Sequence, residues 1–501
     1  MISLATLLAD PIDAAKAADD PDIRTFLHEL QANILKGHGR RHTGHLFMSF
    51  AGMKPDAVAA VVRGLAGYCT SAGEQLRRNR RNPPHLDGGP VRCLMLSASG
   101  FRALGGLAAM PPGAAFAAGM AARQGVLNDP ARAAWQVPGW HDAEPAVDAM
   151  FLMAHSDADP HGAPGAESHA AGVTADLEAV EEWLNGSGVH ILAVERGFQQ
   201  MKTFDPAAGP EGVEHFGYVD GRSQPLFLAD DVAREPGANW SPKFSPSQFI
   251  VPDPNGRVPL AAGSYFVFRK LEQNVRGFKA AEQALATALG LAGDDRERAG
   301  AMVVGRFEDG TPLVQSCTAT KAKPPNDFNF AGDPDALTCP FHAHIRKTNP
   351  RGDIVRAIGV PESAERNPIM ARRGITYGAP RPMNAAGDDF DDEGQEPTGD
   401  VGLLFMAYMA SIEDQFEFTQ QSWVNNPSFV GNLNPPPGRP QTGIDPVIGQ
   451  SPNAADKVQT WQDGCTPGSV PHQFAFADFV KMLGGEYFFA PSLSFLRGVG
   501  L

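Results

Sequence analysis

The sequence predicts an α+β protein with two halves, each an antiparallel sheet with helices on one face. Apolar strands alternate with segments of helical periodicity in both halves of the chain. The strand–helix–strand order resumes after a Pro-rich stretch, although no short repeat accompanies it. The 501 residues include 54 Gly and 43 Pro, which indicates long loops added to these halves.

In the first half, the segments follow one another in order after an arm of about 20 residues that we expect to be loose. Helical spacing of apolar residues after Asp22, the expected N-cap, predicts the first helix at 22–34. A basic loop, RRNRRNPPH (77–85), is expected after the second helix. The other predicted elements are strands at 45–50, 91–99, 148–157 and 190–198 and helices at 55–67 and 174–185.

The second half repeats this rhythm with longer insertions. Strands are predicted at 263–271 and 402–409, a helix at 275–289, and a further helix that contains Phe416, Phe418 and Trp423. Irregular tracts of this length are uncommon and usually functional, so we expect them to wall a pocket. They occupy residues 126–147, 228–258, 321–340, 378–400 and 431–470.

Composition excludes several classes of partner and compartment. The formal net charge of −15 argues against nucleic acid or an anionic membrane, because phosphate contacts need clustered Lys and Arg. No run of about 18 apolar residues predicts a spanning helix. The N-terminus lacks the basic region of a secretory signal, so the cytoplasm is the expected location.

The five cysteines do not form a recognisable framework. They are odd in number and far apart, and no two form a CxxC pair. We therefore expect reduced, mostly buried thiols rather than disulfides or a Cys-rich zinc site.

Three segments contain side chains that suggest chemistry. HFGYVDGRSQPLF (215–227) predicts a constrained turn around Asp220, whose carboxylate either caps the turn or acts as an acid or base. CPFHAHIRKTNPRGD (339–353) contains His342 and His344, which would bind a metal together on one strand face or ligate a haem iron singly. MARRGITYG (370–378) adds an arginine pair, which is uninformative alone.

Together and in this order, these segments resemble the dye-decolorizing (Dyp-type) haem peroxidase family. LQANILKGHGRRHTGHLFMSF, GSYFVFRKLEQ, GLLFMAYMASIEDQFEFTQQSW and GGEYFFAPS also resemble its long subgroup, so the likeness spans most of 24–495. The resemblance implies two ferredoxin-like halves with haem in the C-terminal one. It divides the chain into an N-terminal arm (1–23), an N-terminal half (24–235) ending in the GxxDG loop, and a C-terminal haem-binding half (236–501).

The resemblance also implies which residues hold the haem. His344 is the expected axial ligand of the iron, and His342 is left as pocket wall or surface. Arg351 and Arg346 are expected to pair with haem carboxylates, and Gly221 to lie against the cofactor. A carboxylate from SIEDQFEF is expected to accept a hydrogen bond from the axial imidazole, with Glu413 and Asp414 as the alternatives.

On the opposite side of the haem, the resemblance assigns acid–base chemistry to Asp220 and charge stabilisation to Arg372, with Arg373 as the alternative. An aspartate stays ionised to lower pH than an imidazole does, so we expect activity on the acid side of neutrality. The guanidinium would stabilise negative charge during O–O heterolysis.

The expected function is a cytoplasmic oxidoreductase with one haem b per chain, which reduces hydrogen peroxide and oxidises dyes, phenolics or similar one-electron donors via a ferryl intermediate. A haem-handling protein with incidental peroxidase activity is the alternative. A non-haem metalloenzyme using His342 and His344 is a third reading. We expect no nucleic-acid or membrane partner, and the resemblance leaves a homo-oligomer open.

Two further features concern electron donors and ions. Trp240, Trp423 and Trp461 are candidate surface sites of electron transfer to bulky dyes. The acidic loop 385–400 either binds a hard cation or is simply solvated. The net negative charge suggests that cationic donors react faster than anionic ones at low salt.

Overall fold

The computed structural model describes residues 2–81, 88–137, 140, 146–156, 170–207, 209–235, 237–321, 326–380, 396–431 and 442–501. In this part of the chain, ten strands join into one sheet, and two small hairpins lie outside it.

The N-terminal half forms an antiparallel sheet with the spatial order β2-β3-β1-β4. Its central strand pairs Leu46 with Phe151 on one side and Val194 on the other. This order and the β-α-β-β-α-β succession are those of a ferredoxin-like unit. The elements are β1 (His42–Ser49), α3 (Pro55–Ala66), β2 (Val91–Ser97), β3 (Ala149–His155), α8 (Ala171–Leu184) and β4 (His190–Phe198).

The C-terminal half has the same topology. Its antiparallel strands have the order β10-β11-β8-β14, which matches that of the first half strand for strand. The predicted recurrence is therefore confirmed at the level of topology. The elements are β8 (Ala262–Gln273), α10 (Val275–Ala288), β10 (Ile375–Tyr377), β11 (Gly402–Met409), a π-helical segment (Ile412–Glu417 and Thr419–Val424) and β14 (Val480–Ala490).

The two sheets join edge to edge into a closed ring. β14 pairs with β2, β4 pairs with β10, and β8 pairs with both β14 and β11. Closure leaves these strands without exposed edges. The short strands β7 (Val251–Pro252) and β9 (Ala371–Arg372) extend the sheet, and β5 (Gln200–Asp205) with β6 (Gly209–Val213) and β12 (Val458–Trp461) with β13 (His472–Ala475) form the hairpins.

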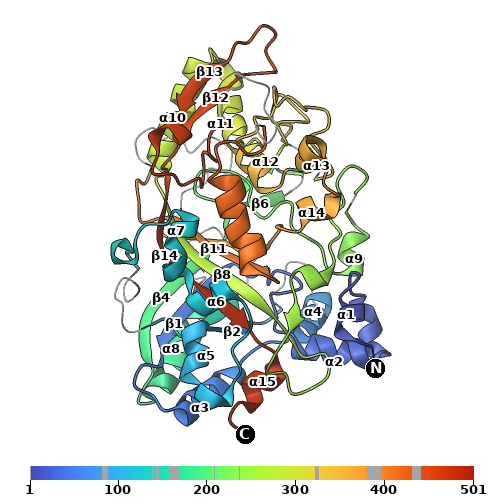
Figure 1. The fold of residues 1–501 in the computed structure, drawn as a ribbon, viewed down its shortest axis with the longest axis vertical. Coiled ribbons are helices and arrows are strands. Elements are labelled where there is room, and N and C mark those ends of the chain that lie inside the picture. Colours follow the sequence, from blue (N-terminus) through green and yellow to red (C-terminus); the bar gives the residue numbers. More distant parts are fainter. Residues whose placement is uncertain are drawn as a thin grey trace.

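The remaining helices are short and cover the ring and its insertions (Figure 1). In Figure 1, α3, α5 and α8 lie beside the strands of the N-terminal half, and α10, α11 and the β12–β13 hairpin lie at the opposite end of the molecule. The helices are α1 (Leu4–Leu7), α2 (Pro21–Glu29), α4 (Ala72–Arg81), α5 (Ala98–Ala103), α6 (Ala114–Ala118), α7 (Gln124–Leu127), α9 (Ala229–Val232), α11 (Glu297–Val304), α12 (His344–Thr348), α13 (Asp353–Ile358), α14 (Glu362–Arg366) and α15 (Leu493–Gly498). Short 3₁₀ turns occupy Ala14–Ala18, Gly105–Leu107, Met120–Arg123, Arg132–Ala134, Pro246–Gln248, Gly293–Arg296 and Ala454–Lys457.

Several local predictions were wrong. Asp20 rather than Asp22 caps α2, because its carboxylate accepts the N–H groups of Asp22 and Ile23. The first residues are packed rather than loose, with Leu8 and Ile12 buried in the core. The basic run that we predicted as a loop is helical as far as Arg81. The sequence analysis also missed β10 and β14 as strands.

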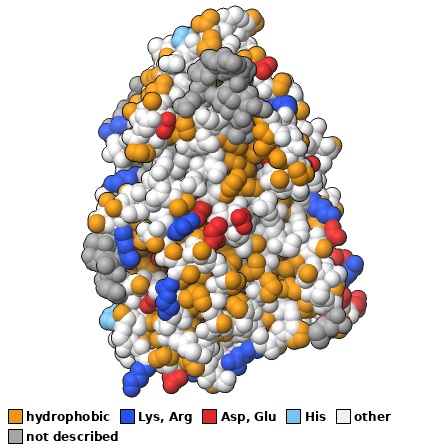
Figure 2. All heavy atoms as spheres, viewed as in Figure 1, with side chains coloured by type: hydrophobic (Ala, Val, Ile, Leu, Met, Phe, Trp, Pro, Cys, Tyr) orange, Lys and Arg blue, Asp and Glu red, His pale blue; other side chains and the backbone are white. Residues whose placement is uncertain are grey.

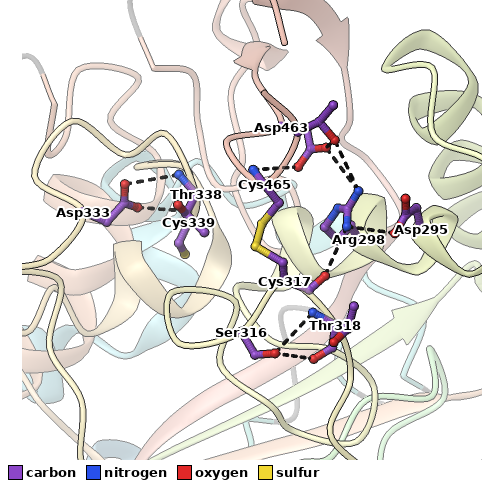
Figure 3. Close-up of a disulfide and its surroundings, with 11 residues drawn as sticks. Asp295, Arg298, Ser316, Cys317, Thr318, Asp333, Thr338, Cys339, Asp463 and Cys465 are labelled. Atoms are coloured by element: carbon purple, nitrogen blue, oxygen red, sulfur yellow. Dashed lines mark hydrogen bonds and ion pairs between the residues drawn. A yellow bond between two sulfur atoms is a disulfide. The ribbon is translucent and has the colours of Figure 1, made fainter. Parts of the chain in front are cut away.

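The expectation of reduced cysteines is wrong for one pair. Cys317 and Cys465, separated by 148 residues, form a disulfide. Figure 3 shows it beside Arg298, which bonds to the carboxylates of Asp295 and Asp463. The other cysteines, Cys69, Cys93 and Cys339, are buried free thiols as expected. The disulfide joins the segment that leads into α12 to the segment after β12.

Two features of the described chain concern its helices and the charge on one face. Across the described residues, we find no helix that is both long and apolar enough to span a bilayer. On the face in Figure 2, Lys and Arg side chains are scattered among acidic and apolar ones rather than gathered in one basic patch.

Candidate active site

A cavity of about 310 Å³ lies on one face of the C-terminal sheet, within the range of small-molecule and cofactor sites. Alternate residues of three strands line it, as the two-residue period of a strand requires. The other lining residues come from the GxxDG turn, from α12, from the RRG segment and from the π-helical segment. The strand residues are Arg269, Leu271 and Gln273 of β8, Leu403 and Phe405 of β11, and Val480 and Met482 of β14.

His344 and Asp445 form the wall of the cavity that we call the proximal wall. The Nδ1 atom of His344, the first residue of α12, lies 2.8 Å from Oδ2 of Asp445. Asp445 is fully buried, and its Oδ1 accepts the N–H groups of Val447 and Ile448. The carboxylate thus fixes the ring and directs the Nδ1 proton towards itself, which leaves Nε2 to bind a ligand in the cavity.

The predicted partners of His344 were wrong. Glu413 Oε1 accepts the N–H of Ala115 on another part of the molecule, and Asp414 bonds to Ser411 at the start of the π-helical segment. Neither residue lines the cavity. Asp445 lies in the tract 431–470, which the sequence indicated only as an irregular loop.

Asp220 and Arg372 also line the cavity, and we call the part of the lining that they form the distal wall. Arg372 Nη1 lies 4.0 Å from Asp220 Oδ1, and both side chains are about a third exposed, at 37% and 35%. Gly221 also lines the cavity, and its φ of +80° favours glycine in this turn. Arg372 Nη2 donates to the carbonyl of Arg222, which holds the guanidinium beside the turn.

Of the two alternatives for the distal arginine, Arg372 is the one that pairs with Asp220. Arg373 donates to the carbonyls of Asn33 and Ile34, so it ties β9 to the N-terminal half. Arg373 also lines the cavity, but these backbone carbonyls hold its guanidinium. Burial lowers the pKa of Arg373 to about 10.

Two buried arginines, Arg306 and Arg351, form a cationic corner of the cavity. Both donate to Ser223 Oγ and Asn326 Oδ1, and no carboxylate lies within ion-pair distance of either among the described residues. Burial lowers the pKa of Arg306 to about 9 and lowers that of Arg351 as well. Desolvated guanidiniums without a carboxylate partner favour an anionic ligand group, such as a haem carboxylate. Sequence analysis predicted Arg351 and missed Arg306.

Arg346, predicted to contact the haem, points elsewhere. It is fully buried and forms ion pairs with Asp333 and Asp353, at 3.0 and 2.7 Å. These pairs satisfy its charge within the fold, and it does not line the cavity. Lys347, next along α12, is also fully buried and donates to backbone carbonyls.

His342 and His344 do not share a ligand site. His342 packs edge-on against Trp461 at 4.2 Å between ring centroids, and burial lowers its pKa to about 3. Among the described residues, no group of three or more His, Cys, Asp or Glu side chains is placed to hold a metal ion. The acidic loop 385–400, for which a bound cation and simple solvation are the alternatives, falls mostly on residues 385–395, which lie outside the described residues.

The three predicted tryptophans are not on the surface. Trp240, Trp423 and Trp461 are 7%, 2% and 0% exposed, whereas Trp183 of α8 is 41% exposed. Trp240 packs against Arg351, whose guanidinium carbon lies 5.6 Å from the ring centroid. A surface role for these three residues is therefore wrong.

Glu214, which sequence analysis did not single out, lines the cavity near Asp220. Its carboxylate accepts the N–H groups of Phe216 and Tyr218 and the side-chain amide of Gln273, at 2.8, 3.0 and 2.5 Å. These hydrogen bonds hold the backbone of the GxxDG turn around the carboxylate. Burial and the charge of Asp220 raise the pKa of Glu214 to about 7.

A second cavity also adjoins the distal wall. It shares Asp220 and Arg372 with the first cavity, and residues from the N-terminal half, including Lys36 and Arg40, line the rest. The distal pair therefore lines both cavities.

Comparisons with known proteins give a consistent result. No family model matches the chain. It is 43% identical to the multifunctional dye peroxidase DyP2 of Amycolatopsis sp., over 95% of this chain and 96% of that protein. It is 31% identical to the dye-decolorizing peroxidase msp1 of Mycetinis scorodonius, over 74% and 69%. Among solved structures, DyP2 superposes with a TM-score of 0.84 at 39% identity, over 98% and 99% of the two chains. The DyP-type peroxidase of Anabaena sp. superposes with a TM-score of 0.82 at 33% identity, over 98% and 97%.

Proposed function

The chain belongs to the dye-decolorizing peroxidase family, and we propose that one haem b per chain fills the cavity between the proximal and distal walls. The chain is a Dyp-type peroxidase, and enzymes of this family depend on haem. The donor set of the cavity fits the cofactor. His344 offers its Nε2 atom, and Arg306 and Arg351 offer cations for the haem carboxylates.

The bound haem would supply the iron at which hydrogen peroxide reacts, and it would supply the electrons that reduce the peroxide. The protein then has to move one proton from one oxygen of peroxide to the other, so that water leaves. Asp220 is the base and then the acid in this step, directly or through one water. The Arg372 guanidinium stabilises negative charge on the departing oxygen without a protonation step.

One observation carries the proposal. Residues 220, 344 and 372, predicted from three separate motifs, line a single cavity, in which the histidine is oriented by Asp445 and the aspartate lies beside the arginine. A haem-handling protein would need the histidine and the arginines but not the distal pair. The distal pair therefore favours peroxidase chemistry.

The reducing substrates are dyes and similar one-electron donors. Such donors are too bulky for a distal wall that Asp220 and Arg372 share, so they are oxidised at or near the surface. Trp183 and Tyr68 are the most exposed Trp and Tyr of the described chain, at 41% and 47%, and both lie in the N-terminal half.

The location of the enzyme stays a prediction. The absence of a membrane-spanning helix from the described residues leaves the compartment open. The Cys317–Cys465 disulfide weighs against a reducing cytoplasm, where such bonds are rare.

The test is haem loading followed by peroxide-dependent decolorization of a dye. The wild-type protein should show a haem Soret band and bleach the dye only when peroxide is added. His344→Ala should lose most of the haem, and the matched control His190→Ala, at an exposed position of β4, should keep it. Full haem content with an unchanged spectrum in His344→Ala would overturn the ligand assignment. Haem binding without peroxide-dependent bleaching would overturn the peroxidase.

A further inference from the structure

α12 presents two polar side chains to the same part of the fold, one helical turn apart. His344 binds the carboxylate of Asp445, and Lys347, three residues later, donates from Nζ to the carbonyl of Asn426 at 2.6 Å and to that of Trp423 at 3.3 Å. Lys347 is fully buried, so it is neither a surface charge nor a solubility feature. Neither the motifs nor the proposed function uses it.

The turn that Lys347 binds also holds Asp445. The N–H of Asp445 donates to the carbonyl of Val424 at 3.0 Å, between the two carbonyls that Lys347 contacts. The helix, the 423–426 turn and Asp445 therefore form one connected unit, which contains both the ammonium and the imidazole.

The electrostatics of the unit are unusual. Burial disfavours the ammonium form of Lys347, and the charge of Asp445 is what supports it. The pKa of Lys347 is lowered to about 7, so the side chain is a cation in mildly acidic solution. By the same Coulomb attraction, the ammonium draws on the negative charge of Asp445 and makes this carboxylate a weaker hydrogen-bond acceptor.

We propose that Lys347 is a positioning residue for the axial histidine, a buried counter-charge that weakens the pull of Asp445 on the Nδ1 proton of His344. The inference rests on the proposed function, because it concerns the histidine assigned to the iron. A carboxylate that takes more of the Nδ1 proton makes the imidazole more anionic and a stronger donor, and this stabilises oxidised iron. Lys347 limits that effect.

A merely structural role predicts the opposite sign. If Lys347 only tied the turn in place, its loss would loosen Asp445, weaken its hydrogen bond to His344 and make the imidazole less anionic. If Lys347 is a counter-charge, its loss leaves Asp445 a stronger acceptor and makes the imidazole more anionic. The direction of the change thus separates the two roles.

The experiment compares haem-loaded Lys347→Gln, Lys347→Met and Lys347→Arg with wild type at pH 5, where the lysine is charged. Lys347→Gln keeps a hydrogen-bond donor without the charge, Lys347→Met removes both, and Lys347→Arg keeps the charge. We expect Gln and Met to lower the iron(III)/iron(II) midpoint potential and to raise the iron–imidazole stretching frequency in resonance Raman spectra. Arg should restore both. Lys202→Met, at another buried lysine that is ion-paired with Glu308, is the matched control.

Each outcome decides between the roles. Unchanged or oppositely shifted potential and frequency in Lys347→Gln would overturn the inference, even if the enzyme still turned over. If Lys347→Met fails to fold, Lys347→Gln and Lys347→Arg still give the comparison. Wild-type protein whose haem lacks an iron–imidazole band would contradict the proposed function instead, so the two failures are distinguishable.

Discussion

The two walls of the cavity are built in opposite ways. On the proximal wall, His344 and Asp445 are 2.8 Å apart, and the aspartate is fully buried with its second oxygen occupied by backbone N–H groups. On the distal wall, Asp220 and Arg372 are 4.0 Å apart, and about a third of each side chain is exposed. A side chain that must hold the iron in a fixed position needs the tight, buried proximal arrangement. Side chains that transfer a proton to and from peroxide need the more open distal arrangement, which leaves room for the peroxide.

The elements that carry the residues of the two walls differ in the same way, tightly held on the proximal side and open on the distal side. The proximal residues belong to α12 and to a buried loop, and a disulfide joins the segments around them. The distal residues belong to a turn and to the two-residue strand β9, with a second cavity behind them. Changes on the distal wall should therefore alter turnover and spare haem binding, whereas changes on the proximal wall should affect the cofactor first.

The largest effect is expected for Asp220→Asn. The amide cannot carry the proton, so peroxide-dependent dye oxidation should fall by roughly 10²–10⁴-fold while haem content stays as in wild type. Turnover from steady-state bleaching and haem content from the Soret absorbance measure the two quantities. Asp230→Asn, at an exposed position of α9, is the control. Loss of haem together with activity would show that the two walls are not separable.

Removal of the disulfide tests how far the proximal side depends on a covalent tie. Cys317→Ser opens a link across 148 residues, and we expect it to lower the free energy of unfolding by about 2–4 kcal/mol. Urea unfolding under non-reducing conditions is the measurement, with the neighbouring Ser316→Ala as control. Equal stability of the variant and wild type would mean that the noncovalent contacts suffice. Turnover per bound haem should not change, because the distal pair lies outside the linked segments.

Asp445→Asn tests the tightness of the proximal pair itself. The amide keeps the shape but loses the charge that orients His344, and such changes beside a metal ligand typically cost about 10–100-fold in affinity or activity. Haem dissociation measured by transfer to apomyoglobin reports this directly. Glu413→Gln, at the position that the sequence had suggested, should leave haem affinity unchanged. The assignment of Asp445 fails if the two variants behave alike.

The sequence predicted the distal wall better than the proximal one, for a physical reason. Asp220, Gly221 and Arg372 belong to local motifs whose glycines fix the backbone within a few residues. Asp445 is 101 residues from His344, in a tract without periodicity, and only tertiary packing brings the two together. No local pattern distinguishes it from Glu413 or Asp414.

The fold shows the same limit. Strands β4 and β11 were predicted with their bounds, because each contains an uninterrupted run of apolar residues. β10 is only three residues long, and it lies where the edges of the two halves meet.

The two buried arginines of the cavity differ in the same way. Arg351 lies in a recognisable motif, whereas Arg306 acquires its role only when folding brings it to Ser223 and Asn326.

The smallest effect concerns Glu214, which lies beneath the distal turn and ought to make that wall sensitive to pH. Its pKa is about 7 in the folded protein and 4.5 is the ordinary value, so the folded state binds more protons than the unfolded state between these limits. Stability should therefore fall as pH rises from about 4.5 to 7 and level off above, with a slope of at most about 1.4 kcal/mol per pH unit from this group. Glu214→Gln cannot ionise and should flatten the profile of urea-unfolding free energy over that window. A variant whose profile has the same slope as that of wild type would show that another group titrates in this window. Glu214 would then not make the distal wall sensitive to pH.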